Sequence, residues 1–99
     1  MKARPQPAAT AWYVYIVECA DGTLYTGIAR DVAERLAKHN AGKGARYTRG
    51  RRPVRLAYRQ RFASKGAALR REYAIKQLTV GAKRALSAAR KRARSARKS

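Results

Sequence analysis

Residues 12–27 read "WYVYIVECADGTLYTG" and hold three of the six tyrosines of the chain and its one tryptophan. The first eight of these residues are rich in β-branched and aromatic side chains, and both alternating faces are largely apolar. This pattern predicts a central strand that is covered on both sides. The Asp21-Gly22 dipeptide predicts a tight turn, and residues 24–28 form the returning strand. The stretch therefore predicts a β-hairpin whose tyrosines serve either packing or chemistry.

A helix and a basic loop are expected next. Asp31 and Glu34 have the spacing of a capping box and predict a helix that ends near residues 40–42. The segment "GKGARYTRGRRP" follows, and its glycines and basic residues are typical of a loop.

The second half of the chain predicts one more strand and two more helices. Pro53 delimits a strand over residues 54–61. Ser64 is an N-cap candidate for a helix that reaches about residue 78, and Thr79 is one for a last helix. The order is β-β-α-loop-β-α-α, which favours an α+β fold with a central three-stranded antiparallel sheet flanked by helices.

Composition divides the chain into three parts. Residues 1–10 contain two of the three prolines and are expected to be a flexible N-terminal arm. Residues 11–82 carry the strands and helices of one small domain. Residues 83–99 hold eight Lys/Arg and no acidic residue, and are expected to form a basic C-terminal helix or tail.

The charge indicates a polyanionic partner. The chain has 25 Lys+Arg against 5 Asp+Glu, a net charge of +20, and such an imbalance most often indicates nucleic acid. Without residues 83–99, 17 basic residues remain against 5 acids, so the domain body is basic too. A solvated surface and an anionic membrane surface are the alternatives. The residues expected to contact DNA phosphates are those of the basic loop: Lys43, Arg46, Arg49, Arg51 and Arg52.

Cysteine and hydropathy patterns exclude several protein classes. The single cysteine, Cys19, excludes an internal disulfide and a multi-cysteine metal site. No apolar run approaches the roughly 18–20 residues that span a bilayer. The first residues lack the apolar region of a secretory signal. A cytoplasmic protein without a membrane segment is therefore expected.

Of the five acidic residues, only Glu72 lacks an ordinary structural role. The other four suit a turn, a helix cap, a capping box and a solvated strand end: Asp21, Asp31, Glu34 and Glu18. On a helical wheel of 100° per residue, Glu72 lies close to Ala68 and Ile75, in an apolar arc that also includes Leu69 and Tyr73. A carboxylate there is costly unless it is paired. It is either in a salt bridge with an arginine or a ligand for a hard cation such as Mg²⁺.

Arg35 and His39 lie four residues apart on the first predicted helix, so they share a face. A lone histidine is commonly an ordinary surface or core residue. Arginine beside histidine, however, suits an anionic ligand, because a guanidinium clamps phosphate oxygens and an imidazole exchanges protons near neutral pH.

The tyrosine-bearing hairpin, the helix with Arg35 and His39, and the later Glu72 follow one another along the chain as in the GIY-YIG nuclease superfamily, which the sequence therefore resembles. The two triplets that name the family correspond to Tyr13-Val14-Tyr15 and Tyr25-Thr26-Gly27, and the similarity extends over about residues 12–78. The segments "GKGARYTRGRRP" and "LRREYAIKQL" look like those of small stand-alone bacterial GIY-YIG proteins.

The resemblance implies a small α+β fold and cleavage of DNA phosphodiester bonds with one divalent metal, Mg²⁺ or Mn²⁺. By this similarity Tyr15 would be the general base or the phenolate that orients the attacking water. Tyr25 would hydrogen-bond the phosphate or the water, and Gly27 would let the backbone approach the site.

The resemblance also implies roles for three helical residues. Arg35 would stabilise the pentacovalent phosphate, His39 would position or relay the proton of Tyr15, and Glu72 would hold the metal. A tyrosine hydroxyl titrates near 10, so Arg35 and the cation are expected to lower the pKa of Tyr15.

Two functions therefore follow from the sequence. The first is a metal-dependent DNA endonuclease of repair or recombination, acting on branched or nicked DNA. The alternative is a basic nucleic-acid-binding protein that retains the fold without cleaving; a membrane-surface or ribosome-associated protein is a third option.

Overall fold

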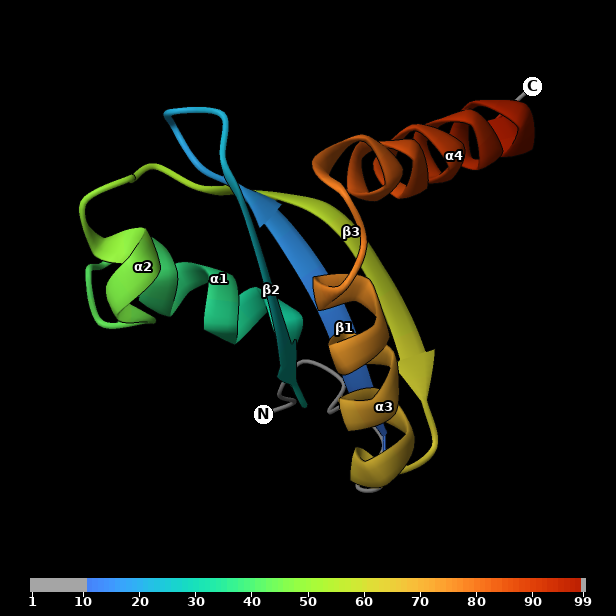
Figure 1. Cartoon of the computed structure of the whole chain (residues 1–99), viewed down its shortest axis with the longest axis horizontal. Helices are drawn as coiled ribbons and strands as arrows, with labels where there is room; N and C mark the ends of the chain where they lie inside the picture. The colour runs from blue at the N-terminus through green and yellow to red at the C-terminus, as the bar shows by residue number, and fades with distance from the viewer. Residues whose placement is uncertain (1–10, 99) are drawn as a thin grey trace, which may run out of the picture.

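The computed structural model describes residues 11–98, with side chains described as far as residue 89. Three strands form one small sheet, and the helices lie around it (Figure 1). In chain order they are β1 (Trp12–Glu18), β2 (Leu24–Ala29), α1 (Val32–Asn40), α2 (Arg46–Arg49), β3 (Arg55–Phe62), α3 (Lys65–Lys76) and α4 (Val80–Lys98). The α+β prediction with a three-stranded antiparallel sheet is confirmed. The N-terminal arm predicted for residues 1–10 lies outside the described residues.

The strand order is β2-β1-β3, so β1 is the central strand that its two apolar faces predicted. The turn after β1 is held by Asp21, whose Oδ1 accepts the backbone N–H of Thr23 at 3.1 Å and the Thr23 hydroxyl at 2.6 Å. Gly22 in this turn has φ +86°, which a glycine adopts without strain. Antiparallel pairing then sets Tyr15 opposite Gly27.

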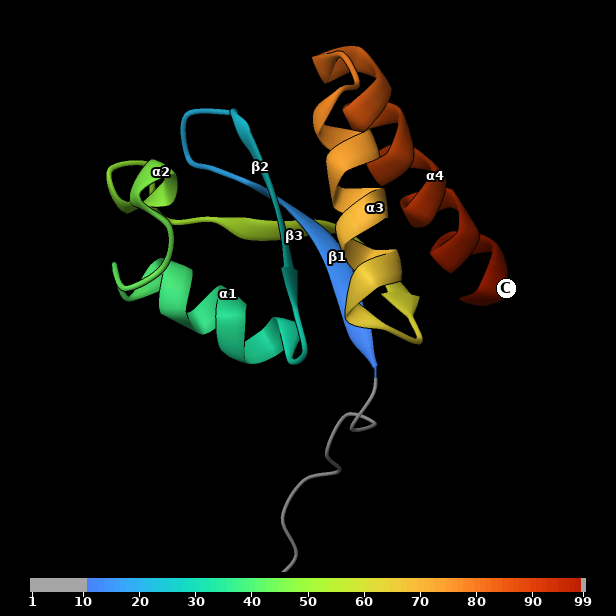
Figure 2. The ribbon, with the colours of Figure 1, turned by 60° about the horizontal axis from the view of Figure 1, so that its bottom comes forward.

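The two faces of the sheet belong to two separate cores. On one face Tyr15 and Val17 pack with Val32 of α1. On the other face Val14 and Ile16 pack with the buried residues of α3, and Leu86 of α4 joins them. Figure 2 shows α1 and α3 separated by the sheet in this way. Because consecutive residues of β1 face opposite sides, Tyr15 points toward α1.

All three predicted helix caps are present. Asp31 Oδ1 accepts the N–H of Glu34 at 3.1 Å, Ser64 Oγ that of Ala67 at 3.2 Å, and Thr79 Oγ1 that of Ala82 at 3.1 Å. These bonds satisfy N–H groups that a first helical turn leaves without partners. The starts of α1, α3 and α4 are thereby fixed by local sequence.

The end of α1 is tied to the start of β3 by Asn40. Its side-chain amide donates to Val54 O at 3.0 Å, and its Oδ1 accepts the Val54 N–H at 2.7 Å. This two-bond contact imitates a strand pair and fixes the C-terminal turn of α1, where His39 lies.

Some expected details are wrong. The segment predicted as a loop contains the short helix α2, and β3 is shifted by one residue from the expected 54–61. Leu69 and Tyr73, assigned to the apolar arc of α3, are exposed, so the buried stripe of that helix is narrower than the wheel indicated. Within residues 11–98, no helix is both long and apolar enough to cross a membrane.

Candidate active site

The phenol of Tyr15 lies across its strand partner Gly27. A Cβ atom at position 27 would lie 2.7 Å from Tyr15 Oη and 2.9 Å from its Cζ, well inside the distance at which atoms repel. Only glycine therefore leaves room for this side chain, which is 2% exposed. Gly27 was expected to let the backbone approach the site, and in the structure it makes room for Tyr15.

Two buried hydrogen bonds connect the Tyr15 hydroxyl to the loop after α1. Tyr15 Oη lies 2.9 Å from His39 Nε2, and the other ring nitrogen of His39 lies 2.9 Å from Thr48 Oγ1. Thr48 Oγ1 in turn donates to Ala45 O at 2.9 Å. His39 and Thr48 are both 0% exposed. The sequence predicted His39 here but gave no role to Thr48; the only signal was that Thr48 is the one serine or threonine in an otherwise basic loop.

Arg35 acts on Tyr15 and His39 from the preceding turn of α1. Its guanidinium lies close enough to the Tyr15 hydroxyl to favour the phenolate and so to lower its pKa. Burial is a larger influence, however, so the pKa of Tyr15 is raised overall, with smaller contributions from Tyr25 and Glu72. Arg35 thus lowers the pKa of Tyr15 as expected, but it does not set the net direction, because removing the phenol from water disfavours the phenolate more than Arg35 favours it.

The pKa of His39 is lowered, first by burial and second by the positive charge of Arg35. Both influences penalise the imidazolium. The ring is therefore neutral near pH 7, with one nitrogen that donates and one that accepts a hydrogen bond.

Tyr25 extends the site outward through aromatic contacts. Its ring meets His39 edge-on, with centroids 5.4 Å apart, and stacks against Tyr47 at 5.9 Å. The Arg51 guanidinium covers Tyr47 at 4.2 Å from the ring centroid. Ring contacts thus connect the buried His39, through Tyr25, to Tyr47 in the exposed loop.

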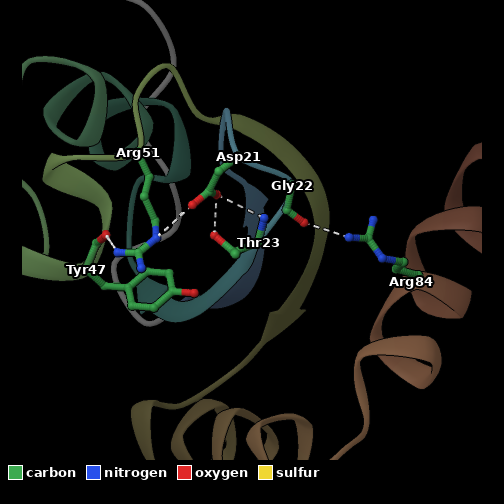
Figure 3. Close-up of polar contacts among 6 residues, drawn as sticks. All are labelled: Asp21, Gly22, Thr23, Tyr47, Arg51 and Arg84. Atoms are coloured by element: carbon green, nitrogen blue, oxygen red, sulfur yellow. Dashed lines mark hydrogen bonds and ion pairs between the residues drawn. The ribbon is translucent and has the colours of Figure 1, made fainter.

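Arg51 also fixes this loop against the hairpin (Figure 3). Its Nε bonds Asp21 Oδ2 at 3.1 Å, and its NH1 donates to Tyr47 O at 2.9 Å. Bonds from Thr23 and the charge of Arg51 lower the pKa of Asp21. Asp21 therefore has a second role beyond the turn. Arg51, expected to contact DNA, is already engaged within the protein.

The remaining loop residues that were expected to bind DNA are exposed on and around α2: Lys43, Arg46, Arg49 and Arg52. Arg52 Nε donates to Arg49 O at 2.9 Å and its NH1 to Asn40 O at 3.4 Å, while the side chain remains exposed. The cations lie in the same segment as Thr48 and Tyr47, so the loop joins the buried site to the charged surface.

Glu72 lies in the buried stripe of α3 between Ala68 and Ile75, with 17% of its side chain exposed. Its partner is Lys76, whose Nζ lies 3.2 Å from Oε2, rather than one of the arginines. The charge of Glu72 raises the pKa of Tyr15, so the carboxylate is within electrostatic range of the phenol. Among residues 11–98, no cluster of three or more His, Cys, Asp or Glu could hold a metal ion.

Comparison with known proteins identifies the family of this chain. A family model described as the GIY-YIG catalytic domain matches residues 11–84. The chain belongs to the GIY-YIG family. The resemblance drawn from the two tyrosine triplets is thereby confirmed, and the membership makes the chain a nuclease-family protein.

Several curated relatives are similar over most of their length. UPF0213 protein DP2720 of Desulfotalea psychrophila is 57% identical over 84 residues, which cover 84% of this chain and 76% of the relative. UPF0213 protein VNG_2274C of Halobacterium salinarum is 58% identical over 74 residues, 75% of this chain and 96% of the relative.

Solved structures agree with the fold. The solution NMR structure of UPF0213 protein BH0048 from Bacillus halodurans has a TM-score of 0.51 at 50% identity, covering 79% of this chain and 83% of that one. Protein EF2693 from E. faecalis gives a TM-score of 0.53 at 36% identity, with 75% and 79% covered.

Proposed function

We propose that this chain is a metal-dependent endonuclease that hydrolyses DNA phosphodiester bonds. The observation that carries the proposal is the buried contact of Tyr15 Oη with His39 Nε2 at 2.9 Å, beside Arg35. A phenol paired with an imidazole can move a proton, and a guanidinium can compensate the negative charge that a phosphate gathers during hydrolysis. Membership of the GIY-YIG family supports the same reaction.

The proton path follows from the protonation states. Tyr15 holds its proton near neutral pH because burial raises its pKa, so a free phenolate is not available. In the proposed step the Tyr15 oxygen accepts a proton from the attacking water while its own proton passes to His39 Nε2. The water oxygen bonds to phosphorus, the P–O bond to the departing sugar oxygen breaks, and that oxygen takes a proton from solvent. His39 ends as an imidazolium and Tyr15 as a neutral phenol.

Glu72 would hold Mg²⁺ or Mn²⁺. One carboxylate together with phosphate oxygens and waters is a usual Mg²⁺ environment. Lys76, whose side chain is 50% exposed, pairs with this carboxylate at i,i+4, a contact that contributes about 0.5 kcal/mol or less, so a divalent cation can replace it. When bound, the cation would stabilise negative charge on the phosphate as a Lewis acid.

The substrate proposed is branched or nicked DNA of repair or recombination. The exposed cations of the loop, Lys43, Arg46, Arg49 and Arg52, would bind its phosphates without reading base sequence.

A second candidate function is nucleic-acid binding without cleavage. The raised pKa of Tyr15 and the Lys76 ion pair on Glu72 favour it, because each makes a catalytic group less ready in the protein alone. The net charge of +20 suits both functions equally.

Cleavage assays separate the two functions. Supercoiled, nicked and branched DNA are incubated with the protein and Mg²⁺, Mn²⁺ or EDTA, beside Tyr15→Phe, Glu72→Gln and a control, Glu34→Gln, at an exposed acid of α1. The nuclease proposal expects metal-dependent cleavage that Tyr15→Phe and Glu72→Gln each reduce by about 10²-fold or more, with Glu34→Gln active. Tight binding with no cleavage of any DNA under any condition supports the second function.

A further inference from the structure

Thr48 is the last side chain of the buried hydrogen-bond chain, and its geometry determines where the protons lie. Its Oγ1 lies 2.9 Å from both Ala45 O and His39 Nδ1. A carbonyl oxygen can only accept, and a threonine hydroxyl has one hydrogen to donate. That hydrogen therefore points to Ala45 O, and a lone pair of Oγ1 faces His39. It follows that His39 Nδ1 carries a hydrogen and donates it to Thr48.

The protonation state of the second ring nitrogen, Nε2, follows from that of Nδ1. A neutral imidazole has one N–H, and in His39 it is on Nδ1, so Nε2 has a free lone pair. Tyr15 Oη, 2.9 Å away, must be the donor to Nε2. The proton order along the chain is Tyr15 to His39, His39 to Thr48, and Thr48 to the Ala45 carbonyl.

Gly44 makes Thr48 difficult to replace by water. A Cβ at position 44 would lie 2.9 Å from both His39 Cα and Cγ, and closer still to Nδ1. The backbone thus passes directly against this side of the ring. With His39 and Thr48 both 0% exposed, the threonine oxygen is the acceptor that Nδ1 reaches.

We infer that Thr48 is a positioning residue that holds His39 in its Nδ1–H tautomer and thereby makes Nε2 the acceptor of the Tyr15 proton. The tautomer is a property of the folded chain, and its consequence for cleavage rests on the proposed function. In the proton step, the Tyr15 hydrogen moves to Nε2 while the Nδ1 hydrogen stays on Nδ1. In the opposite tautomer, Nε2–H would donate to Tyr15 and could accept nothing.

NMR of the ring nitrogens tests this directly. The chain has one histidine, so long-range ¹H–¹⁵N correlations of ¹⁵N-labelled protein at pH 7.5 contain one imidazole pattern. We expect a protonated Nδ1 and an unprotonated Nε2 in the wild type and in Thr48→Ser, which keeps the hydroxyl. Thr48→Val keeps the shape but removes the acceptor, and is expected to shift the ring toward Nε2–H.

An Nε2–H tautomer in the wild type would overturn the inference, and so would a folded Thr48→Val that stays entirely Nδ1–H. If Thr48→Val does not fold, the wild-type and Thr48→Ser spectra decide. A purely structural role would change stability without changing the tautomer.

Cleavage kinetics separate this inference from the proposed function. If the wild type cleaves DNA, Thr48→Val is expected to lose about 10²-fold or more in kcat, while KM changes little and Thr48→Ser retains activity. An Nδ1–H wild type without cleavage upholds the inference and counts against the nuclease proposal. Cleavage by a protein in which the His39 tautomer is the same with and without the Thr48 hydroxyl supports the nuclease proposal and overturns the inference.

Discussion

At the scale of single residues, the site depends on close contacts that only particular side chains allow. Tyr15 reaches His39 because Gly27 leaves the space that the phenol occupies. Burial disfavours both the Tyr15 phenolate and the His39 imidazolium, and the charge of Arg35 disfavours the imidazolium further. The Tyr15–His39 pair is therefore neutral. The burial that excludes water also makes the hydroxyl a weaker acid, which is why the proposed proton step passes through His39.

Gly27→Ala tests this packing. The added Cβ would meet Tyr15 Oη and Cζ, and the ring cannot retreat without breaking its hydrogen bond to His39. We expect the free energy of unfolding to fall by about 1–3 kcal/mol, together with loss of cleavage, measured by urea denaturation and DNA assay. The control is Gly50→Ala, where a Cβ meets nothing within 4 Å. Equal effects of the two substitutions would contradict the close-approach explanation.

The sequence predicted some of these residues and not others, for physical reasons. Arg35 and His39 were found because helical spacing places them on one face, and Glu72 because a carboxylate between Ala68 and Ile75 is conspicuous. Thr48 was not found, because its contact with His39 depends on the path of the intervening loop.

At the scale of elements, the segment around α2 is held in place by Arg51. It bonds Asp21 of the hairpin turn and Tyr47 of α2, and its backbone carbonyl accepts the Ala20 N–H at 2.8 Å. The hairpin and the loop are thereby joined at two levels, side chain and main chain. The ring stack of Tyr25 on Tyr47 joins the same two segments.

Arg51→Ala and Lys43→Ala should therefore have different effects. Arg51→Ala removes an ion pair, a carbonyl bond and the cover of Tyr47, so we expect it to lower the stability of the fold by about 1 kcal/mol, since partly exposed pairs contribute little. Lys43→Ala should leave stability unchanged and reduce the salt slope of DNA binding by about 1. Denaturation and binding titrations at several salt concentrations measure both. A stable Arg51→Ala with a reduced salt slope would instead make Arg51 a phosphate contact.

The elements themselves were predicted where local chemistry determines them. Asp31, Ser64 and Thr79 cap their helices as expected, because a cap requires only its own neighbours. The helix α2 was not predicted, because its four residues lie between glycines and it starts without a side-chain cap. Its position comes from contacts with the hairpin that are distant in sequence.

At the scale of the whole molecule, the basic C-terminal segment is anchored to the domain. Leu86 packs on the core shared by β1 and α3. Arg84 donates to Gly22 O at 2.6 Å and pairs with Glu18, which also binds Arg55. The first half of α4 therefore contacts the hairpin and the core, and residue 83, where the basic C-terminal segment was expected to start, lies within this helix.

Truncation after residue 89 should separate binding from catalysis, whereas truncation after residue 82 should not. The shorter deletion removes six Lys/Arg and retains Leu86 and Arg84. We expect it to weaken DNA binding and to reduce the salt slope by up to about 5, with stability and the cleavage rate at saturating DNA unchanged. Truncation after residue 82 also removes Leu86 from the core, so we expect a further loss of about 2 kcal/mol or more in stability. Salt titrations, denaturation and single-turnover cleavage measure these effects. A truncation after residue 89 that abolished cleavage at saturating DNA would show that the basic end of α4 takes part in the reaction itself.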